Sequence, residues 1–395
     1  MSDTMDKQAH PGRLTRRRVM KGAAAGAAAL AIGKPFLALA QTAPIKIGFP
    51  MPLTGPFGAE AKEQVACGEI AVKEFNAAGG LGGRMAELLV RDDKLQPGEA
   101  ATRTLELIEK DKVNFVVGAL SAAVQLSVNA VTKAREVIYV SISQSDAINE
   151  AKDFSKYTFH EALNPHMTAG AVGRYAFPKF GKKVAYLYAD YAYGHEMVRG
   201  FKRAGQAFGV ETILEVGHPL GTADYSTFLP RIQAAKPDVL CICNFGRDQV
   251  NSLKQAVGFG MNKQMKLVVP VMLYAQRMAG GPDVFEGVIG GANYHWTIED
   301  KIPSAKKFND AYRATSGGAP PSDYGAYGYT GVAVLLDAVK KAGTTDTDKV
   351  IAALEALKYD RYKGPQYFRK CDHQSVQSVL IVESKPKAKM GNQWD

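Results

Sequence analysis

The stretch VAYLYADYAYG, residues 184–194, contains the unit from which the fold can be predicted. Val184 to Tyr188 is an apolar, β-branched and aromatic run that predicts a buried strand, and Ala189 to Gly194 predicts the loop that follows. An amphipathic stretch, typical of a helix, comes next. Strands and helices that alternate in this way form parallel sheets with helices on both faces.

The same unit recurs in two successive sets along the chain. We expect strands at 45–49, 85–90, 115–117 and 138–140, and again at 184–188, 213–216, 239–243 and 267–271. Two sets of about four strands predict an α/β protein with two Rossmann-like lobes. The roughly 355 residues after position 40 are enough for two domains.

The first 40 residues are typical of an export signal. Arg16 to Arg18 form a charged start, residues 22–32 are apolar but too few to span a bilayer, and Ala-Leu-Ala at 38–40 suits a signal peptidase. TRRRVMK, residues 15–21, resembles the twin-arginine consensus. The resemblance implies export to the periplasm by the twin-arginine route and a mature chain that begins near Gln41. A basic disordered tail is the alternative interpretation.

The charge of the chain argues against nucleic acid as a partner. The sequence has 49 Lys and Arg against 39 Asp and Glu, a net charge of +10. Seven of the basic and two of the acidic residues lie in the first 40 positions, so the rest has 42 and 37, a net charge of +5. These charges are spread along the chain and form no basic block interleaved with aromatic residues.

The motifs of common enzymes and metal proteins are missing from the sequence. Gly79 to Gly83 follows a predicted helix and precedes a strand, the reverse of a phosphate cradle, so we expect a tight turn. His195-Glu196 lacks the second His of a zinc protease, and no Cys or His pair has zinc-ligand spacing. Cys241 and Cys243 are expected to be buried free thiols. We therefore expect a protein without a metal or cofactor that is not an enzyme.

Ligands of open parallel sheets bind beyond the carboxyl ends of the strands. The loops expected there are 50–57, 118–124, 141–146, 189–194, 244–248 and 270–276. Several of them carry motifs that occur in a fixed order: PLTGPFG (52–58), NAAGGLGG (76–83), RDD (91–93), DYAYG (190–194), GTADYSTFLP (221–230) and AKPDV (235–239). Taken together, these motifs resemble the leucine/isoleucine/valine-type substrate-binding proteins of ABC importers, over essentially the whole mature chain.

The resemblance implies two α/β lobes that are joined by three crossing segments and close over one small ligand. We expect the crossings near 161–165, 294–297 and 364–370. The first lobe would then contain 44–162 and 297–365, and the second lobe 163–296 and 366–395.

The resemblance also implies a set of ligand contacts. Backbone amides at the helix start formed by Ser121, Ala122 and Ala123 would bind a carboxylate. Ser143 and Ser145 would donate hydroxyl hydrogen bonds, or else cap the helix that follows. The apolar part of the ligand would contact Phe57, Tyr193, Phe245, Met272, Tyr274 and Tyr324, several of which have core packing as the alternative role.

Two positions depart from the family pattern. Amino-acid binders have an acid after the fourth strand of the second lobe, where residues 269–276 have none. Glu60 replaces an aromatic residue that packs on the ligand. Glu60 would then bind the ligand's ammonium group, or the ligand has no ammonium group, or Glu60 faces solvent. A buried ammonium without an anionic partner is costly, and on that ground we favour an aromatic or aliphatic acid over an α-amino acid.

The function expected from these features is that of a periplasmic solute receptor. It would work as a monomer, bind a small carboxylate ligand, and deliver it to an ABC permease with its ATPase subunits. The same fold also serves sensors that signal through a separate membrane partner. An exported enzyme is a third possibility, which turnover of a bound ligand would reveal.

Overall fold

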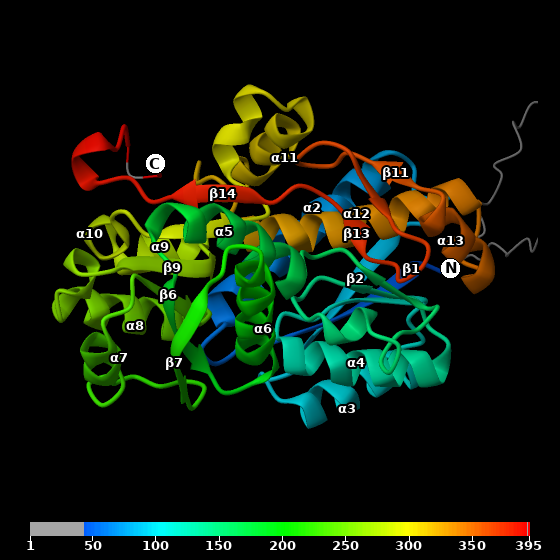
Figure 1. The fold of residues 1–395 in the computed structure, drawn as a ribbon. Helices are drawn as coiled ribbons and strands as arrows, with labels where there is room; N and C mark the ends of the chain where they lie inside the picture. Colours follow the sequence, from blue (N-terminus) through cyan, green and yellow to red (C-terminus); the bar gives the residue numbers. More distant parts are fainter. Residues whose placement is uncertain (1–42, 393) are drawn as a thin grey trace, which may run out of the picture. The chain divides into compact units, whose positions relative to one another are not determined.

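A computed structural model describes residues 43–392 and 394–395 (Figure 1). The predicted export signal lies outside these residues. The first sheet has five parallel strands in the order β2 (Ala86–Asp92), β1 (Ile45–Met51), β3 (Phe115–Gly118), β4 (Tyr139–Ser141) and β5 (Thr158–His160). Helices α2 (Gly58–Ala77) and α12 (Asp323–Ala342) cover one face, and α3 (Pro97–Glu109) and α4 (Ala122–Arg135) cover the other.

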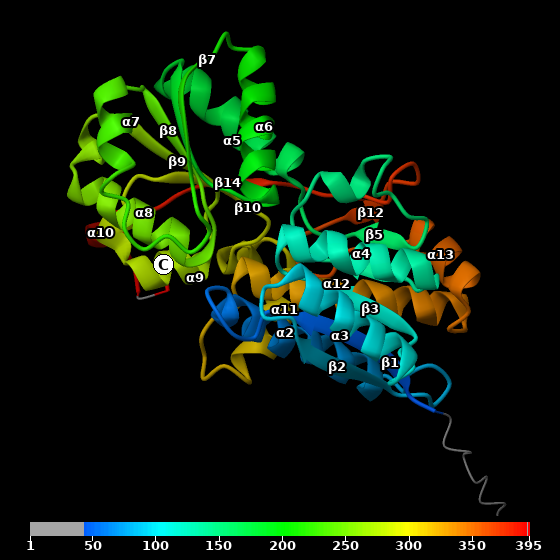
Figure 2. The ribbon, with the colours of Figure 1, turned by 90° about the horizontal axis from the view of Figure 1, so that it is seen from below.

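The second sheet has six strands. Their order is β14 (Leu380–Glu383), β10 (Ile289–Ala292), β9 (Lys266–Val271), β8 (Val239–Cys243), β6 (Lys183–Ala189) and β7 (Glu211–His218), and only β14 runs antiparallel to its neighbour. Helices α5 (Pro165–Phe180) and α6 (Ala192–Gln206) pack on one face. Helices α7 (Leu229–Ala235), α8 (Gly246–Gly258) and α10 (Pro282–Phe285) pack on the other (Figure 2). The predicted α/β fold with two parallel-sheet lobes is confirmed.

The central strand β8 illustrates why this sequence builds a two-faced sheet. All five of its residues are buried, as expected for a strand that is covered by helices on both sides. Cys241 and Cys243 face the core with α5 and α6, whereas Leu240 and Ile242 face the core with α7 and α8. Both cysteines are buried free thiols, as predicted.

The glycine-rich segment between α2 and β2 is a turn. Gly79, Gly80, Gly82 and Gly83 all have positive φ angles, and Leu81 pairs with Arg84 in an isolated bridge. A Cβ atom at Gly80 would lie 2.2 Å from the carbonyl oxygen of Arg84, so this position requires glycine. The predicted tight turn is confirmed.

The chain passes between the two sheets at three places. The first lies between β5 and α5, and the second follows β10 and leads into η3 (Trp296–Asp300). The third differs from the expected segment 364–370, because β12 (Gln366–Phe368) pairs with β11 (Lys358–Tyr359) and β13 (Ser375–Val376) in a small sheet of its own. The strand that joins the second sheet is β14, so the chain passes over after β13.

The first and third passages lie side by side. The Gln374 amide donates to the carbonyl oxygen of Ala162 at 2.9 Å, and Asn164 donates to Gln374 at 3.0 Å. In the part of the chain that the structure describes, no helix is both long and apolar enough to cross a membrane. The same residues include no group of three or more His, Cys, Asp or Glu side chains placed to hold a metal ion.

Candidate functional site

Four aromatic side chains from the two lobes meet at the carboxyl ends of the strands. Phe57 and Tyr324 come from the first lobe, and Tyr193 and Phe245 from the second. The ring centroid of Phe245 lies 4.7 Å from that of Phe57, 4.9 Å from Tyr324 and 6.1 Å from Tyr193. None of the four is more than 3% exposed, and the Tyr193 hydroxyl has no hydrogen-bond partner. We call these four residues the aromatic cluster.

Each member of the aromatic cluster lies at the start of a helix. Phe57 precedes α2, Phe245 connects β8 to α8, Tyr193 is in the first turn of α6 and Tyr324 in the first turn of α12. Gly246 allows the two lobes to approach, because a Cβ atom there would lie 2.9 Å from the Phe57 ring. The lobes are therefore closed on each other at this point.

The first turn of α4 has the geometry expected of an anion site. Ser121 is the N-cap residue, and its side chain makes no capping hydrogen bond. The first intrahelical bond runs from the Gln125 amide to the Ser121 carbonyl oxygen, so the amides before Gln125 have no partner inside the helix. Ser121 and Ala122 are buried and Ala123 is half-buried, and none has a bulky side chain that would cover these amides.

Ser143 and Ser145 both make hydrogen bonds within the protein. Ser143 Oγ donates to the carbonyl oxygen of Leu120 at 2.5 Å and thereby fixes the loop that leads into α4. Ser145 Oγ accepts from the Ala147 amide at 3.2 Å and donates to Glu196 Oε1 at 3.0 Å. The bond from Ala147 to Ser145 is local to the loop, because the helix that follows, η1 (Ala147–Asn149), has Asp146 as its N-cap residue and no side-chain capping bond.

Glu196 links the two lobes and was missed in the sequence analysis. It lies on α6 of the second lobe and accepts from the backbone amides of Asp146 at 2.9 Å and Ala147 at 3.3 Å in the first lobe, as well as from Ser145. In return, Asp146 accepts from the backbone amide of His166 on α5 at 2.8 Å. We call Ser145, Asp146, Ala147, His166 and Glu196 the latch. Burial raises the pKa of Glu196 to about 7, with a further contribution from Asp146.

A second group of polar side chains is buried on the other side of the aromatic cluster. Glu60 and Gln64 belong to α2, Gln276 belongs to α9 (Tyr274–Gly280), and Asp323 belongs to α12. Exposed fractions are low for all four: Gln64 0%, Asp323 1%, Gln276 2% and Glu60 6%. Both carboxylate oxygens of Asp323 and both amide groups of Gln64 and Gln276 lack a hydrogen-bond partner. We call Glu60, Gln64, Gln276 and Asp323 the polar cluster.

The carboxyl groups of the polar cluster are poorly compensated. Burial raises the pKa of Asp323 and of Glu60, and the nearby Glu63 raises both further, while the charge of Arg247 partly offsets the effect on Glu60. The side chain of Glu60 is only 6% exposed, which excludes the interpretation in which Glu60 faces solvent. Asp323, Gln64 and Gln276 were not predicted from the sequence, although Asp323 directly precedes the expected site residue Tyr324.

Glu63 has a structural role beside the polar cluster. Its two carboxylate oxygens accept from the backbone amide and from the hydroxyl of Ser322, each at 2.6 Å. Ser322 in turn caps α12 by accepting from the Gly325 amide at 3.0 Å. This chain of bonds between α2 and α12 sets the positions of Asp323 and Tyr324.

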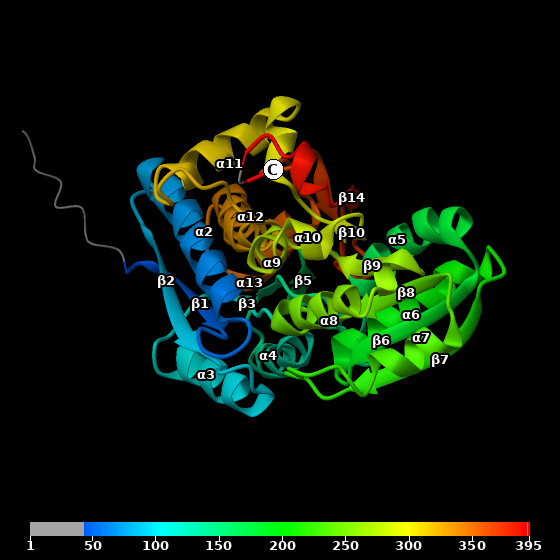
Figure 3. The same ribbon diagram turned by 90° about the vertical axis from the view of Figure 1, so that its left-hand side faces the viewer.

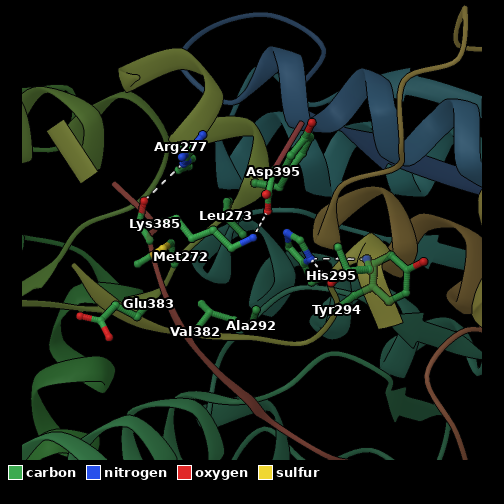
Figure 4. A pocket seen from close by; sticks show the side chains of 13 residues that line it. Met272, Leu273, Arg277, Ala292, Tyr294, His295, Val382, Glu383, Lys385 and Asp395 are labelled. Carbon is green, nitrogen blue, oxygen red and sulfur yellow. Dashed lines mark hydrogen bonds and ion pairs between the residues drawn. The ribbon is translucent and has the colours of Figure 1, made fainter. Parts of the chain in front are cut away.

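A cavity of about 250 Å³ lies elsewhere, between α9, β10, β14 and the last described residues (Figure 4). Met272, Tyr274, Arg277 and His295 are among its lining residues. Met272 belongs to the core with α7 and α8, whereas the lining residues Leu273 and Tyr294 belong to the same core as the aromatic cluster. The structure thus brings Phe57, Tyr193, Phe245 and Tyr324 together. Met272 and Tyr274 line this cavity, and the backbone amide of Tyr274 also lies beside Asp323.

Comparison with known proteins gives a family match over residues 44–389, to a family described as "Periplasmic binding protein". A protein from Brucella abortus named Leu/Ile/Val-binding protein homolog 7 is 26% identical over 369 residues, which cover 89% of this chain and 90% of that protein. The match confirms the resemblance that the ordered motifs predicted.

Solved structures of similar proteins agree with this. A periplasmic binding protein from Burkholderia mallei superposes with a TM-score of 0.84 at 28% identity, over 89% of this chain and 92% of the other. A solute-binding protein of an ABC transporter from Rhodopseudomonas palustris, in complex with 3,4-dihydroxybenzoic acid, has a TM-score of 0.78 at 26% identity, over 86% and 92%.

Proposed function

The chain belongs to the periplasmic binding protein family, and from this we propose that it is the solute receptor of an ABC importer that closes its two lobes over one small carboxylate ligand. The family is one of binding proteins and not of enzymes. The contact between Phe57 and Phe245 carries the proposal, because it joins side chains of different lobes at the carboxyl ends of both sheets. Ligands of parallel α/β sheets bind at this edge.

The carboxylate of the ligand would lie at the start of α4. Three backbone amides without intrahelical partners and the positive end of the helix dipole attract an anion there without a charged side chain. Ser143 would act indirectly, by fixing the Leu120 carbonyl and with it the entry into α4. The unpartnered hydroxyl of Tyr193 would donate to the ligand.

The aromatic cluster favours a ligand with an apolar or aromatic body. The relative from Rhodopseudomonas palustris was solved with 3,4-dihydroxybenzoic acid. Another relative, from Pseudomonas fluorescens, is described as an amino acid ABC transporter substrate-binding protein. Relatives of similar identity thus support an aromatic acid and an amino acid alike, and neither ligand class is excluded by the contacts at α4.

The partners and the location follow from the same proposal. The receptor would reach the periplasm through the twin-arginine route, act as a monomer, and deliver its ligand to a permease with ATPase subunits. The alternative is a ligand sensor that signals through a separate membrane protein. Stimulation of ATP hydrolysis by the reconstituted permease complex, in the presence of the liganded protein, supports the importer; binding to a sensor kinase ectodomain instead supports the alternative.

Thermal unfolding and solution scattering test the proposal together. A ligand at a hundred times its Kd adds about 2.7 kcal/mol to the free energy of unfolding, a shift of roughly 2–4 °C for a chain of this size. We expect this shift with 4-hydroxybenzoate or with leucine, and a smaller radius of gyration in the liganded protein. No shift with any small carboxylate, together with an unchanged radius of gyration, would contradict the proposal.

A further inference from the structure

The acids of the polar cluster form no ion pair in the described part of the chain, and Arg247 is the one cation close enough to lower the pKa of Glu60. Asp323 is 1% exposed, and neither of its carboxylate oxygens has a hydrogen-bond partner. The backbone amides of Tyr274 and Tyr324 lie close enough to lower its pKa, but burial and Glu63 outweigh them. Among the ion pairs of the described residues, none includes Asp323 or Glu60. Buried carboxylates in proteins are normally paired with a cation, so a partner is missing here.

The neighbouring amides add further acceptors to the same place. Gln64 lies one helical turn after Glu60, on the same face of α2. Its side-chain oxygen and that of Gln276 have no donor, and neither does Oδ1 of Asn293, whose amide group donates to the Asp323 carbonyl at 2.9 Å. Beside the Nε2 groups of Gln64 and Gln276, which also lack a partner, there are two carboxyl groups and three amide oxygens. This excess of acceptors suits a group that carries several N–H donors and a positive charge.

The polar cluster and the start of α4 lie on different sides of the aromatic cluster. Helix α4 packs against α6 of the second lobe, whereas Glu60 and Asp323 face residues of α9. Figure 3 shows α4 on one side of α8, and α9 with α12 on the other. Tyr324 lies between them, close to Asp323 and Glu60 and in contact with Phe245.

We propose that the ligand of this protein carries a cationic nitrogen group at the end opposite to its carboxylate, and that Asp323 and Glu60 bind this group. The inference rests on the proposed function and narrows its ligand class. The carboxylate would lie at α4, the apolar body against the aromatic cluster, and an amine or amidine in the polar cluster. An α-ammonium group, which is attached next to its carboxylate, would not reach these acids while that carboxylate lies at α4.

Matched pairs of acids test the proposal by calorimetric titration. The protein is first freed of bound molecules by unfolding in guanidinium and refolding. 4-(Aminomethyl)benzoate is then compared with 4-ethylbenzoate, and 5-aminopentanoate with hexanoate; each pair has similar size and differs in the charge at the far end. We expect the cationic member to bind at least tenfold more tightly in at least one pair. Equal or tighter binding of the neutral member in both pairs would overturn the inference.

The variant Asp323→Asn identifies the residue responsible. We expect it to reduce the ratio of the two affinities, cationic acid over neutral acid, from at least tenfold to less than threefold. A cooperative thermal unfolding transition shows independently that the variant folds. If the cationic acid still binds at least tenfold more tightly than the neutral acid in both Asp323→Asn and Glu60→Gln, the assignment to these two acids is wrong. Glu69→Gln, on the same helix as Glu60, is the control.

The two proposals fail in different ways. If the neutral acids bind and the cationic acids do not, the inference is wrong and the carboxylate receptor stands. If no acid of either kind binds, and neither leucine nor 4-hydroxybenzoate does, the proposed function itself is contradicted.

Discussion

Ser145 of the first lobe donates a hydrogen bond to Glu196 of the second lobe, with 3.0 Å between Oγ and Oε1. The same carboxylate accepts from two backbone amides of the first lobe, and Asp146 accepts from a backbone amide of the second. Each lobe therefore has a carboxylate that accepts hydrogen bonds from backbone amides of the other lobe. Because α6 also carries Tyr193, the latch connects closure of the lobes to the position of a residue that we propose to contact the ligand.

Glu196→Gln should weaken ligand binding, because it removes a hydrogen bond that holds the two lobes in the closed state. The amide can accept only at its oxygen, so at least one of the three donors from the first lobe loses its partner. The loss of a hydrogen bond of this kind costs about 1 kcal/mol, and a bond to a charged group more. We expect roughly a tenfold higher Kd, measured by calorimetry with whichever acid binds. Glu211→Gln, at an exposed position, should leave the Kd unchanged.

The stability of the protein should depend on pH through Glu196. Its pKa is raised from 4.5 to about 7 in the folded protein. A raised pKa means that the folded state binds the extra proton, so the stabilisation is complete below about pH 4.5 and is lost as the pH rises through 7. Between these limits the contribution should fall by up to about 3 kcal/mol.

Unfolding in denaturant at pH 5 and at pH 8 measures this contribution as a difference. Titrating groups that do not interact with Glu196 act equally in the wild type and in Glu196→Gln, so subtraction of the two pH profiles isolates Glu196 together with its interaction with Asp146. Parallel profiles for the two proteins would show that Glu196 has an ordinary pKa.

Gly246→Ala should prevent the lobes from closing. A methyl group there would lie 2.9 Å from the Phe57 ring, and the φ angle of +59° is strained for alanine. We expect at least a tenfold loss of ligand affinity and a radius of gyration that no longer decreases with ligand. Gly258→Ala, at the other end of the same helix with open space around it, should bind normally. Normal binding by Gly246→Ala would show that Phe57 moves aside at little cost.

Tyr193→Ala should remove one wall of the ligand site. The side chain is 3% exposed and contacts Phe245, so both ligand contact and local packing are lost. We expect more than a tenfold loss of affinity by titration. Tyr193→Phe separates the two effects, because the hydroxyl has no partner inside the protein. If loss of the hydroxyl in Tyr193→Phe is enough to weaken binding, the hydroxyl contacts the ligand. Unchanged affinity in both variants would show that Tyr193 is not part of the site.

Ala122→Glu should repel a carboxylate from the start of α4. The new charge would lie beside the unpartnered amides and occupy the space of the anion. We expect loss of carboxylate binding in calorimetry. Ala122→Gln is the control for size, and it should retain more affinity than the glutamate variant. Equal affinities in the two variants would mean that the carboxylate binds elsewhere.

Residues that follow directly from a strand were the most predictable part of the site. Phe57, Tyr193 and Phe245 each come within a few residues of a strand end, and the topology of a parallel sheet brings such positions together. Tyr324 starts a helix and was expected from the family resemblance. Met272 also follows a strand, but its side chain packs in the core with α7 and α8, because successive residues of an extended chain point to opposite faces.

The polar and charged contacts between the lobes were not predictable in the same way. Glu196 and Gln64 lie on helices whose sequences show only amphipathic patterns, and any solvent-facing position would have the same residue types. Gln276 and Asp323 are close to predicted residues, but whether a polar group has a partner depends on helices from distant parts of the chain.

Three features follow from the sequence: the order of strands and helices, the tight turn at Gly79 to Gly83, and the edge at which we propose that a ligand binds. Each depends on local patterns or on the rules of parallel sheets. The link between Ser145 and Glu196, the unpartnered carboxylate of Asp323 and the contact between Phe57 and Phe245 were decided by tertiary structure. They require two lobes to close on each other, and burial and pairing across a closed interface depend on residues far apart in the chain.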